Sequence, residues 1–154
     1  MDTKEFIALI GPAAQASEAQ TGIPASFTVA QAALESGWGR SRLARDGKNL
    51  FGVKADAAWT GEVLELPTRE FLFGKLTSEV ARWRKYADWQ DCLDDHAKFF
   101  RANRRYRSCF DFHTGEGWAK AVAKAGYATD PDYAAKLISV ITKYKLESLD
   151  RCPA

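Results

Sequence analysis

The stretch ALESGWGRSRLA, residues 33–44, places one acidic residue, Glu35, between small apolar residues and a tryptophan flanked by glycines. Apolar residues at helical spacing precede it, and Gly37 is the kind of residue that ends helices in the left-handed conformation. The pattern predicts a short helix from about Ser26 to Ser36, with the acid in its last turn. Because most of its faces are apolar, this helix belongs at the centre of a fold.

A carboxyl group in the last turn of a helix faces the negative end of the helix dipole. We also expect the neighbouring Leu34 and Trp38 to keep water away from it. Both effects disfavour ionisation, so we expect Glu35 to keep a proton near neutral pH and to act as a proton donor. An exposed glutamate at a helix end, with no role in chemistry, is the alternative interpretation.

The rest of the chain predicts further helices on both sides of a β excursion. Apolar residues at helical spacing predict a first helix that ends near residue 21, and later helices over about 89–100, 118–125 and 133–149. Between residues 59 and 86 the pattern becomes β-like, and Phe73-Gly74-Lys75 fits a turn. We predict a single domain over residues 1–154, mainly α-helical (α+β), with one β-hairpin.

Composition limits the classes of function. With 22 basic and 20 acidic residues the formal net charge is +2, which is too balanced for a dedicated nucleic-acid-binding protein. The first 20 residues mix polar residues among the apolar ones, so we expect no secretory signal peptide and no membrane insertion. Delivery to the outside of the cell would then need another route.

Three further features of the sequence bear on metal binding, thiols and surface charge. Cys92 and His96 lie four residues apart on a predicted helix but lack further ligands, so we expect neither a metal nor another cofactor. The three cysteines have no CxxC spacing and are expected to be buried free thiols, with a Cys92–Cys109 disulfide as the alternative. Arginines at 101–107 form a basic run, which is either a solvated surface or a contact for phosphates or an acidic partner.

Several separated motifs resemble the glucosaminidase domain of glycoside hydrolase family 73. They are AQAALESGWGRSRLA (30–44), KNLFGVKA (48–55), WTG (59–61), WRKYADWQDCLDDHAKFFRANRRY (83–106) and AGYATDPDYAAKL (125–137). The resemblance implies a lysozyme-like, mainly helical fold whose β-hairpin lobe forms one wall of a cleft. It also implies a peptidoglycan glycan strand as the substrate, cut at the β-1,4 bond after N-acetylglucosamine.

The resemblance also implies which carboxyl groups act. In that family the glutamate of the ALESGWG motif is the general acid, and it falls here on Glu35, in agreement with the helix-end argument. A segment similar to PTREF (67–71) carries a second acid, which places that acid at Glu70. Glu62 and Glu65 lie nearby, and strand alternation alone does not choose among the three.

Tyr127 corresponds to an active-site tyrosine of the family, and we expect its hydroxyl to orient water, the acetamido group or the second acid. We expect Tyr133, on the helix that follows, to be a packing residue. Sugar sites combine flat aromatic surfaces with hydrogen-bonding side chains. We expect these functions at Trp38, Asn49, Phe51, Lys54 and Trp59.

The sequence therefore predicts an endo-β-N-acetylglucosaminidase that hydrolyses peptidoglycan. Inversion by water activated at Glu70 is our first hypothesis, and retention or assistance by the substrate acetamido group stays open. A muramidase on the same fold and a non-catalytic peptidoglycan-binding module are the rival functions. A phage endolysin or a secreted antibacterial toxin fits this pattern, acting in the periplasm or cell wall after non-classical delivery. A toxin predicts an immunity protein that occludes the cleft.

Overall fold

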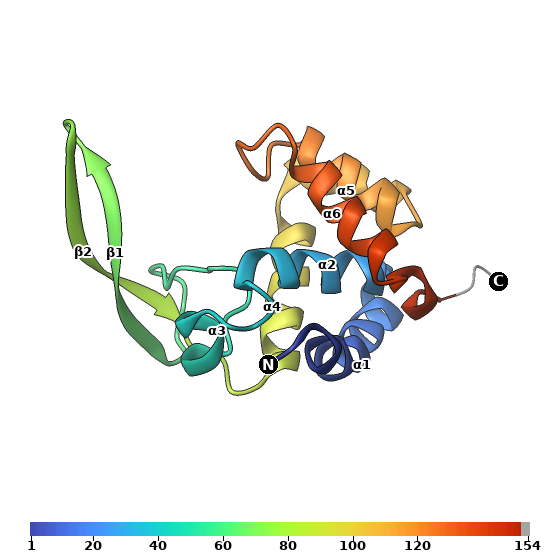
Figure 1. Ribbon diagram of the computed structural model, residues 1–154, viewed down its shortest axis with the longest axis horizontal. Coiled ribbons are helices and arrows are strands. Elements are labelled where there is room, and N and C mark those ends of the chain that lie inside the picture. Colours follow the sequence, from blue (N-terminus) through green and yellow to red (C-terminus); the bar gives the residue numbers. More distant parts are fainter. Residues whose placement is uncertain (152–154) are drawn as a thin grey trace.

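The computed structural model describes residues 1–151, except for the side chains of residues 69–72. Helices form the body, and an antiparallel hairpin projects from it (Figure 1). The helices are α1 (Thr3–Thr21), α2 (Ala25–Ser36), α3 (Arg42–Gly47), α4 (Trp89–Ala102), α5 (Gly115–Lys124) and α6 (Tyr133–Lys143), with 3₁₀ helices η1 (Arg104–Asp111) and η2 (Leu146–Leu149). The predicted mainly helical fold with one hairpin is confirmed.

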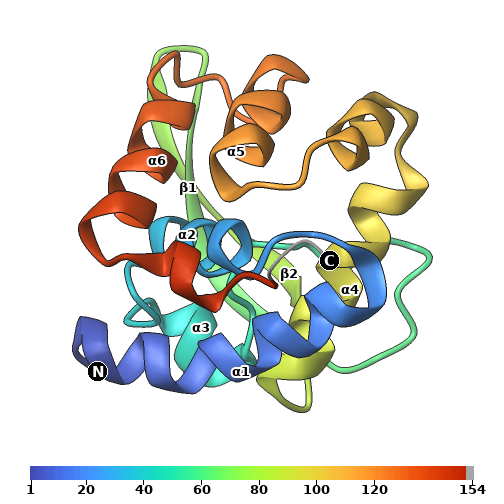
Figure 2. The ribbon, with the colours of Figure 1, turned by 90° about the vertical axis from the view of Figure 1, so that its right-hand side faces the viewer.

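Helix α2 is the centre of the body, as its apolar sequence predicted. The helices α1, α5, α6 and η2 pack around it (Figure 2). Its fully buried Phe27 lies against the rings of Phe100 and Trp118, with centroids 6.0 and 5.4 Å away. Gly37 ends the helix in the left-handed conformation with φ of 59°.

Two carboxylates from distant parts of the chain hold the N-terminus of α2. Glu18 of α1 accepts a hydrogen bond from the backbone N–H of Ala25 at 3.1 Å. Asp150, beyond η2, accepts bonds from the N–H and the hydroxyl of Ser26, both at 2.7 Å. These acceptors pair donors that the first helical turn leaves free, and they complement the positive end of its dipole. The helix that carries Glu35 is therefore anchored at its other end.

Strands β1 (Val63–Leu72) and β2 (Lys75–Arg84) form the hairpin, in a register that runs from Val63↔Arg84 to Leu72↔Lys75. Phe73 and Gly74 connect them with φ of 52° and 76°, as a two-residue hairpin turn requires. The base of β1 contacts α3, and Leu66 is buried there. The predicted hairpin and its turn are confirmed.

Two helical details differ from the sequence expectation. The last helix ends at Lys143 rather than near residue 149, because Lys145 adopts the left-handed conformation, with φ of 52°, before η2 begins. The short α3 and η1 had no clear periodic signal.

The described part of the chain holds two cysteines. Cys92 and Cys109 are buried free thiols, as predicted, and Cys152 lies outside the described residues. Within residues 1–151, no helix combines the length and apolar character that a membrane span requires. Among the described side chains, no group of three or more histidine, cysteine, aspartate or glutamate residues is placed to hold a metal ion.

Candidate active site

A groove of about 900 Å³ lies between the end of α2, the outer face of α4 and the loop that joins α5 to α6. Its lining includes one acid from α2 and several aromatic rings: Glu35, Phe51, His96, Phe99, Tyr106 and Tyr127. Glu35 and Tyr127, which the motifs singled out 92 positions apart, therefore line the same groove.

Glu35 lies in the last turn of α2, where the sequence placed it. Its Oε1 accepts a hydrogen bond from the hydroxyl of Tyr133 at 2.8 Å. The expectation that Leu34 and Trp38 exclude water from this carboxyl group is wrong, because Glu35 is exposed. Its setting is thus a helix C-terminus at an open groove, with a phenol as hydrogen-bond donor.

Tyr133 continues into a chain of buried polar groups. The Nε2 of Gln31 donates to the Tyr133 hydroxyl at 2.9 Å, and the Oε1 of Gln31 lies 2.7 Å from the Nε2 of His96. The ring of Tyr133 stacks on Tyr127, with centroids 5.7 Å apart and 16° between the planes. The predicted packing of Tyr133 is confirmed. Sequence analysis missed its bond to Glu35, because 98 positions separate the two residues and no local pattern links them.

Both tyrosines beside Glu35 stay protonated at neutral pH. Burial, followed by the negative charge of Glu35 and then Tyr106, raises the pKa of the Tyr127 phenol above its ordinary value of 10. Burial is also the main cause that raises the pKa of Tyr133. Each phenol can therefore donate a hydrogen bond, Tyr133 to Glu35 and Tyr127 to a group in the groove.

His96 makes the groove lining neutral and aromatic at this point. Burial lowers the pKa of His96 to about 3, so the imidazole is uncharged at physiological pH. Phe51 stacks on it, with centroids 3.7 Å apart and planes at 9°, and Phe100 lies edge-on at 4.7 Å. Such a surface suits the apolar face of a sugar ring.

Of the five predicted sugar-binding residues, the structure brings Phe51 alone into the lining of this groove. Trp38 instead packs edge-on against Phe6 and Tyr144, with centroids 5.6 and 4.8 Å away. Its placement corrects the expectation of a cleft tryptophan, because Phe6 belongs to α1 and Tyr144 follows α6, and neither lines the groove.

Asn49 is 1% exposed, and both ends of its amide bind backbone groups. Its Nδ2 donates to the carbonyl groups of Val53 and Arg84, each at 2.9 Å, and its Oδ1 accepts from the N–H of Val53 at 3.1 Å. The expected sugar contact is therefore corrected: Asn49 shapes the loop that carries Phe51.

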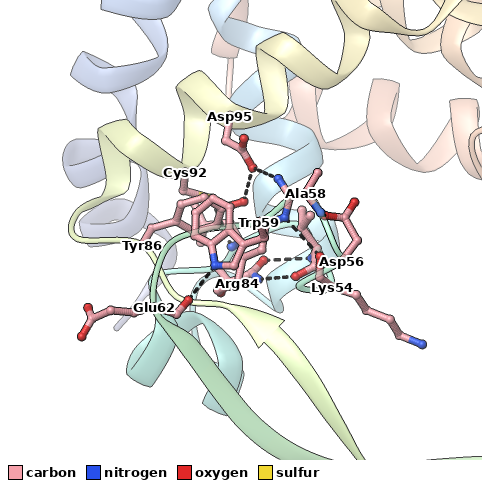
Figure 3. Close-up of polar contacts among 12 residues, drawn as sticks. Lys54, Asp56, Ala58, Trp59, Glu62, Arg84, Tyr86, Cys92 and Asp95 are labelled. Atoms are coloured by element: carbon pink, nitrogen blue, oxygen red, sulfur yellow. Dashed lines mark hydrogen bonds and ion pairs between the residues drawn. The ribbon is translucent and has the colours of Figure 1, made fainter.

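Trp59 and Lys54 lie beside the base of the hairpin (Figure 3). The indole N–H of Trp59 donates to the carbonyl of Glu62 at 2.8 Å, and its ring is edge-on to Tyr86 at 5.5 Å. Trp59 lines an adjoining pocket of about 450 Å³. Lys54 is exposed and is absent from the lining of both cavities.

Arg84 joins the hairpin to α4 (Figure 3). Its guanidinium donates to Asp95 at 2.7 Å and to Asp56 at 3.2 Å, and its Nε donates to the carbonyl of Lys54 at 3.1 Å. The hydroxyl of Tyr86 donates to the same oxygen of Asp95 at 2.5 Å. Burial and this bond raise the pKa of the Tyr86 phenol. Asp95 thus anchors the hairpin, although it also borders the groove.

The second carboxyl group predicted at Glu70 lies outside the described side chains. The backbone of Glu70 is part of β1, opposite Thr77. Of its competitors, Glu62 lines the adjoining pocket and Glu65 is an exposed residue of β1. Neither lines the groove that holds the general-acid candidate, so Glu70 stays a prediction.

Comparison with known protein sequences gives consistent matches. The family model described as mannosyl-glycoprotein endo-beta-N-acetylglucosaminidase matches residues 11–146. The peptidoglycan hydrolase FlgJ of Salmonella typhimurium is 40% identical over 151 residues, which cover 96% of this chain and 48% of that protein. The exo-glucosaminidase LytG of Bacillus subtilis is 38% identical over 130 residues, covering 81% and 45%. The chain spans about half the length of these curated relatives.

A solved structure extends the likeness to three dimensions. The C-terminally truncated glycoside hydrolase domain of Salmonella typhimurium FlgJ matches with a TM-score of 0.83 at 40% identity, covering 94% of this chain and 98% of that one. The lysozyme-like fold predicted from the motifs is therefore confirmed.

Proposed function

Because the chain belongs to the glucosaminidase family that its motifs resemble, and is thus a glycoside hydrolase, we propose that it cleaves the glycan strand of peptidoglycan. One observation carries the proposal. The acid of the ALESGWG motif, Glu35, lies in the wall of a groove of about 900 Å³ and is held there by Tyr133. The relative FlgJ is named for hydrolysis of the same polymer.

In the proposed reaction Glu35 is the general acid. It donates its proton to the glycosidic oxygen while the bond between that oxygen and C1 of N-acetylglucosamine breaks. Water adds to C1, and the proton that water loses passes to Glu70, so each cut creates one new reducing end. If the acetamido oxygen attacks C1 first, Glu70 becomes helpful rather than essential. Tyr127 donates a hydrogen bond that orients the water or the acetamido group.

We propose that cleavage is internal. The groove shares Asp95 and Lys98 with the pocket of about 450 Å³, and Ala102 and Asn103 with another pocket of about 390 Å³. The two pockets therefore adjoin the groove at different residues, so a polymer bound in the groove can continue into both of them. Because the relative LytG is named an exo-glucosaminidase, fragment length is the test. Internal cleavage releases long fragments first, whereas attack from a chain end releases short ones throughout.

The substitution Glu35→Gln tests the central assignment, because it removes the acidic proton and keeps the shape of the side chain. We expect the release of reducing ends from purified peptidoglycan to fall about 10²–10⁴-fold, with an unchanged circular dichroism spectrum. Glu147→Gln, at an exposed glutamate of η2, is the matched control and keeps its activity. Full activity of Glu35→Gln would reject the proposal.

The bond specificity needs its own measurement. Mass spectrometry of reduced fragments identifies the sugar at the new reducing end: reduced N-acetylglucosamine supports the glucosaminidase, and reduced N-acetylmuramic acid would make the enzyme a muramidase. The third function, a non-catalytic wall-binding module, predicts that the protein sediments with insoluble peptidoglycan and releases no soluble fragments.

We also propose a setting in which the enzyme attacks the wall of another cell or of a lysing host, as a secreted antibacterial toxin or a phage endolysin. A toxin needs a protein that protects its producer, and the groove around Glu35 is the surface that such a protein would have to occlude. Coexpression with each neighbouring open reading frame tests this. A product that prevents lysis favours the toxin, and the absence of one favours the endolysin.

A further inference from the structure

Behind Glu35, three buried side chains from three helices form one line of hydrogen bonds. The line runs from His96 on α4 through Gln31 on α2 to Tyr133 on α6, with atom separations of 2.7 and 2.9 Å, and reaches Glu35 at 2.8 Å. His96, Gln31 and Tyr133 are 6%, 0% and 4% exposed. A buried polar chain of this kind is costly unless every member is satisfied, so its arrangement is well determined.

The direction of this line follows from the amide of Gln31. Its Oε1 faces His96 and can only accept, so the Nε2 of His96 must carry the hydrogen. Its Nε2 donates to the hydroxyl oxygen of Tyr133, which leaves the hydroxyl hydrogen to point at Glu35. Every donor in the line is therefore directed towards the carboxyl group.

The neutral state of His96 makes this direction depend on one tautomer. A charged imidazole would have a hydrogen on both nitrogens, but burial lowers the pKa of His96 to about 3 and leaves a single N–H. The rings of Phe51, Phe99, Phe100 and Tyr127 surround it, so Gln31 is the polar group that it meets among the described side chains. With the hydrogen on Nδ1 instead, the Gln31 amide would turn over and every donor would reverse.

The reversed line has a chemical consequence. Tyr133 would then donate to Gln31, and the acidic proton of Glu35 would sit on Oε1 and point at the phenol rather than at a sugar. In the observed direction Oε1 accepts the Tyr133 hydrogen, and because a carbonyl oxygen accepts better than a hydroxyl oxygen, the proton of Glu35 is more stable on Oε2.

We propose that Tyr133, aligned by Gln31 and His96, is a positioning residue that keeps the acidic proton of Glu35 on Oε2, the oxygen that Tyr133 leaves free. This inference rests on the proposed function, in which Glu35 is the general acid. It goes beyond that function because it assigns the delivery of the proton to residues that do not touch the reacting atoms.

The tautomer of His96 can be measured directly in the unmodified protein. The chain has two histidines, and the exposed His113 serves as an internal reference. We expect ¹⁵N chemical shifts of His96 to report a neutral ring protonated at Nε2 from pH 5 to pH 8. A ring protonated at Nδ1 would overturn the proposal without any variant being made.

The substitution Tyr133→Phe removes the hydroxyl and keeps the ring that stacks on Tyr127. We expect kcat on peptidoglycan to fall about 10- to 100-fold with KM within about twofold, because binding is intact and the proton is misplaced. The alkaline limb of the pH–rate profile should move to higher pH, since the ionised carboxylate loses a donor. Tyr144→Phe, at a tyrosine that packs on Trp38, is the matched control and should change neither quantity.

A second variant, Gln31→Glu, keeps the hydroxyl of Tyr133 but changes its direction. An ionised carboxylate at position 31 has no hydrogen to donate, so the Tyr133 hydrogen is drawn to it and away from Glu35. We expect kcat to fall as in Tyr133→Phe.

The outcomes separate this inference from the proposed function. If the unmodified enzyme and Tyr144→Phe cut peptidoglycan and Tyr133→Phe cuts it as fast, the positioning role is wrong and the function stands. A lower kcat with an unmoved pH profile would also overturn it, because that result indicates a purely structural tyrosine. If the unmodified enzyme releases no fragments, the proposed function fails, and the His96 tautomer still decides the direction of the line.

Discussion

The helical body and the hairpin hold their functional groups in different ways. In the body, Glu35 is fixed by a phenol that is itself fixed by two buried side chains. On the hairpin, large apolar side chains at the turn and along β2 are exposed: Phe73, Leu76 and Val80. A two-stranded hairpin is marginally stable by itself, so its position depends on what holds its base.

The base of the hairpin is held mainly by polar contacts. Arg84 and Tyr86 meet on one oxygen of Asp95, and the loop around Asn49 is bonded to the end of β2. The contrast indicates that the body holds Glu35 in a fixed position, whereas the position of any group on the hairpin depends on the contacts at the hairpin's base.

The largest expected effect on the hairpin side is that of Glu70→Gln. If Glu70 activates water, the rate of reducing-end release falls about 10²–10⁴-fold, as for a general base. Glu79→Gln, at an exposed glutamate of β2, is the matched control and stays active. A Glu70→Gln rate above about a tenth of the unmodified rate would assign the second role to the substrate acetamido group and leave the body with the essential chemistry.

A test of the attachment is Arg84→Met, which removes the guanidinium from Asp95. Both side chains are largely buried, at 16% and 23% exposed, so the lost charged hydrogen bonds should lower the free energy of unfolding by about 2–3 kcal/mol. Urea denaturation measures the change. Arg42→Met breaks the exposed pair with Asp46 and should cost under about 0.5 kcal/mol. Equal costs for the two would show that the base is not anchored by this pair.

The buried His96 should make the free energy of unfolding depend on pH. Because the pKa of His96 is lowered to about 3 from 6.5, the unfolded chain binds a proton that the folded protein does not between these values. The contribution of neutral His96 to the free energy of unfolding is therefore fully present above pH 6.5. It falls by about 1.4 kcal/mol for each pH unit as the pH decreases towards 3. His96→Phe should flatten the stability profile over that range, whereas His113→Gln should leave its slope in place.

The smallest effect is expected at the hairpin turn. Phe73 has a positive φ of 52°, which strains a residue with a bulky side chain, and Asn-Gly is the pair that such a turn prefers. Phe73→Asn should therefore raise the free energy of unfolding by about 0.5–1 kcal/mol. Leu76→Asn, also exposed but with ordinary strand geometry, should bring no gain; a gain there would mean that relief of exposed apolar surface, and not of strain, is responsible.

Local patterns were sufficient for the longer helices, the hairpin and the place of the acid, but not for the short α3 and η1 or for the end of α6. Helical spacing followed by glycine located the end of α2, and β-type spacing around Phe73-Gly74 located the hairpin, because both signals act over a few residues. The motif around Glu35 then identified the family. The roles of Asn49 and Trp38 were not accessible in this way, since an amide or an indole fits either a ligand or a packed loop.

By itself, the sequence determined the helical architecture, the hairpin and the presence of an acid at a helix terminus, since periodicity and capping are properties of neighbouring residues. Only the tertiary structure decided which groups meet that acid. Tyr133 reaches Glu35 across 98 positions, and His96 reaches Gln31 across 65. Such pairs depend on how helices cross and which faces they bury, and the free energy that selects one crossing comes from the whole packed core.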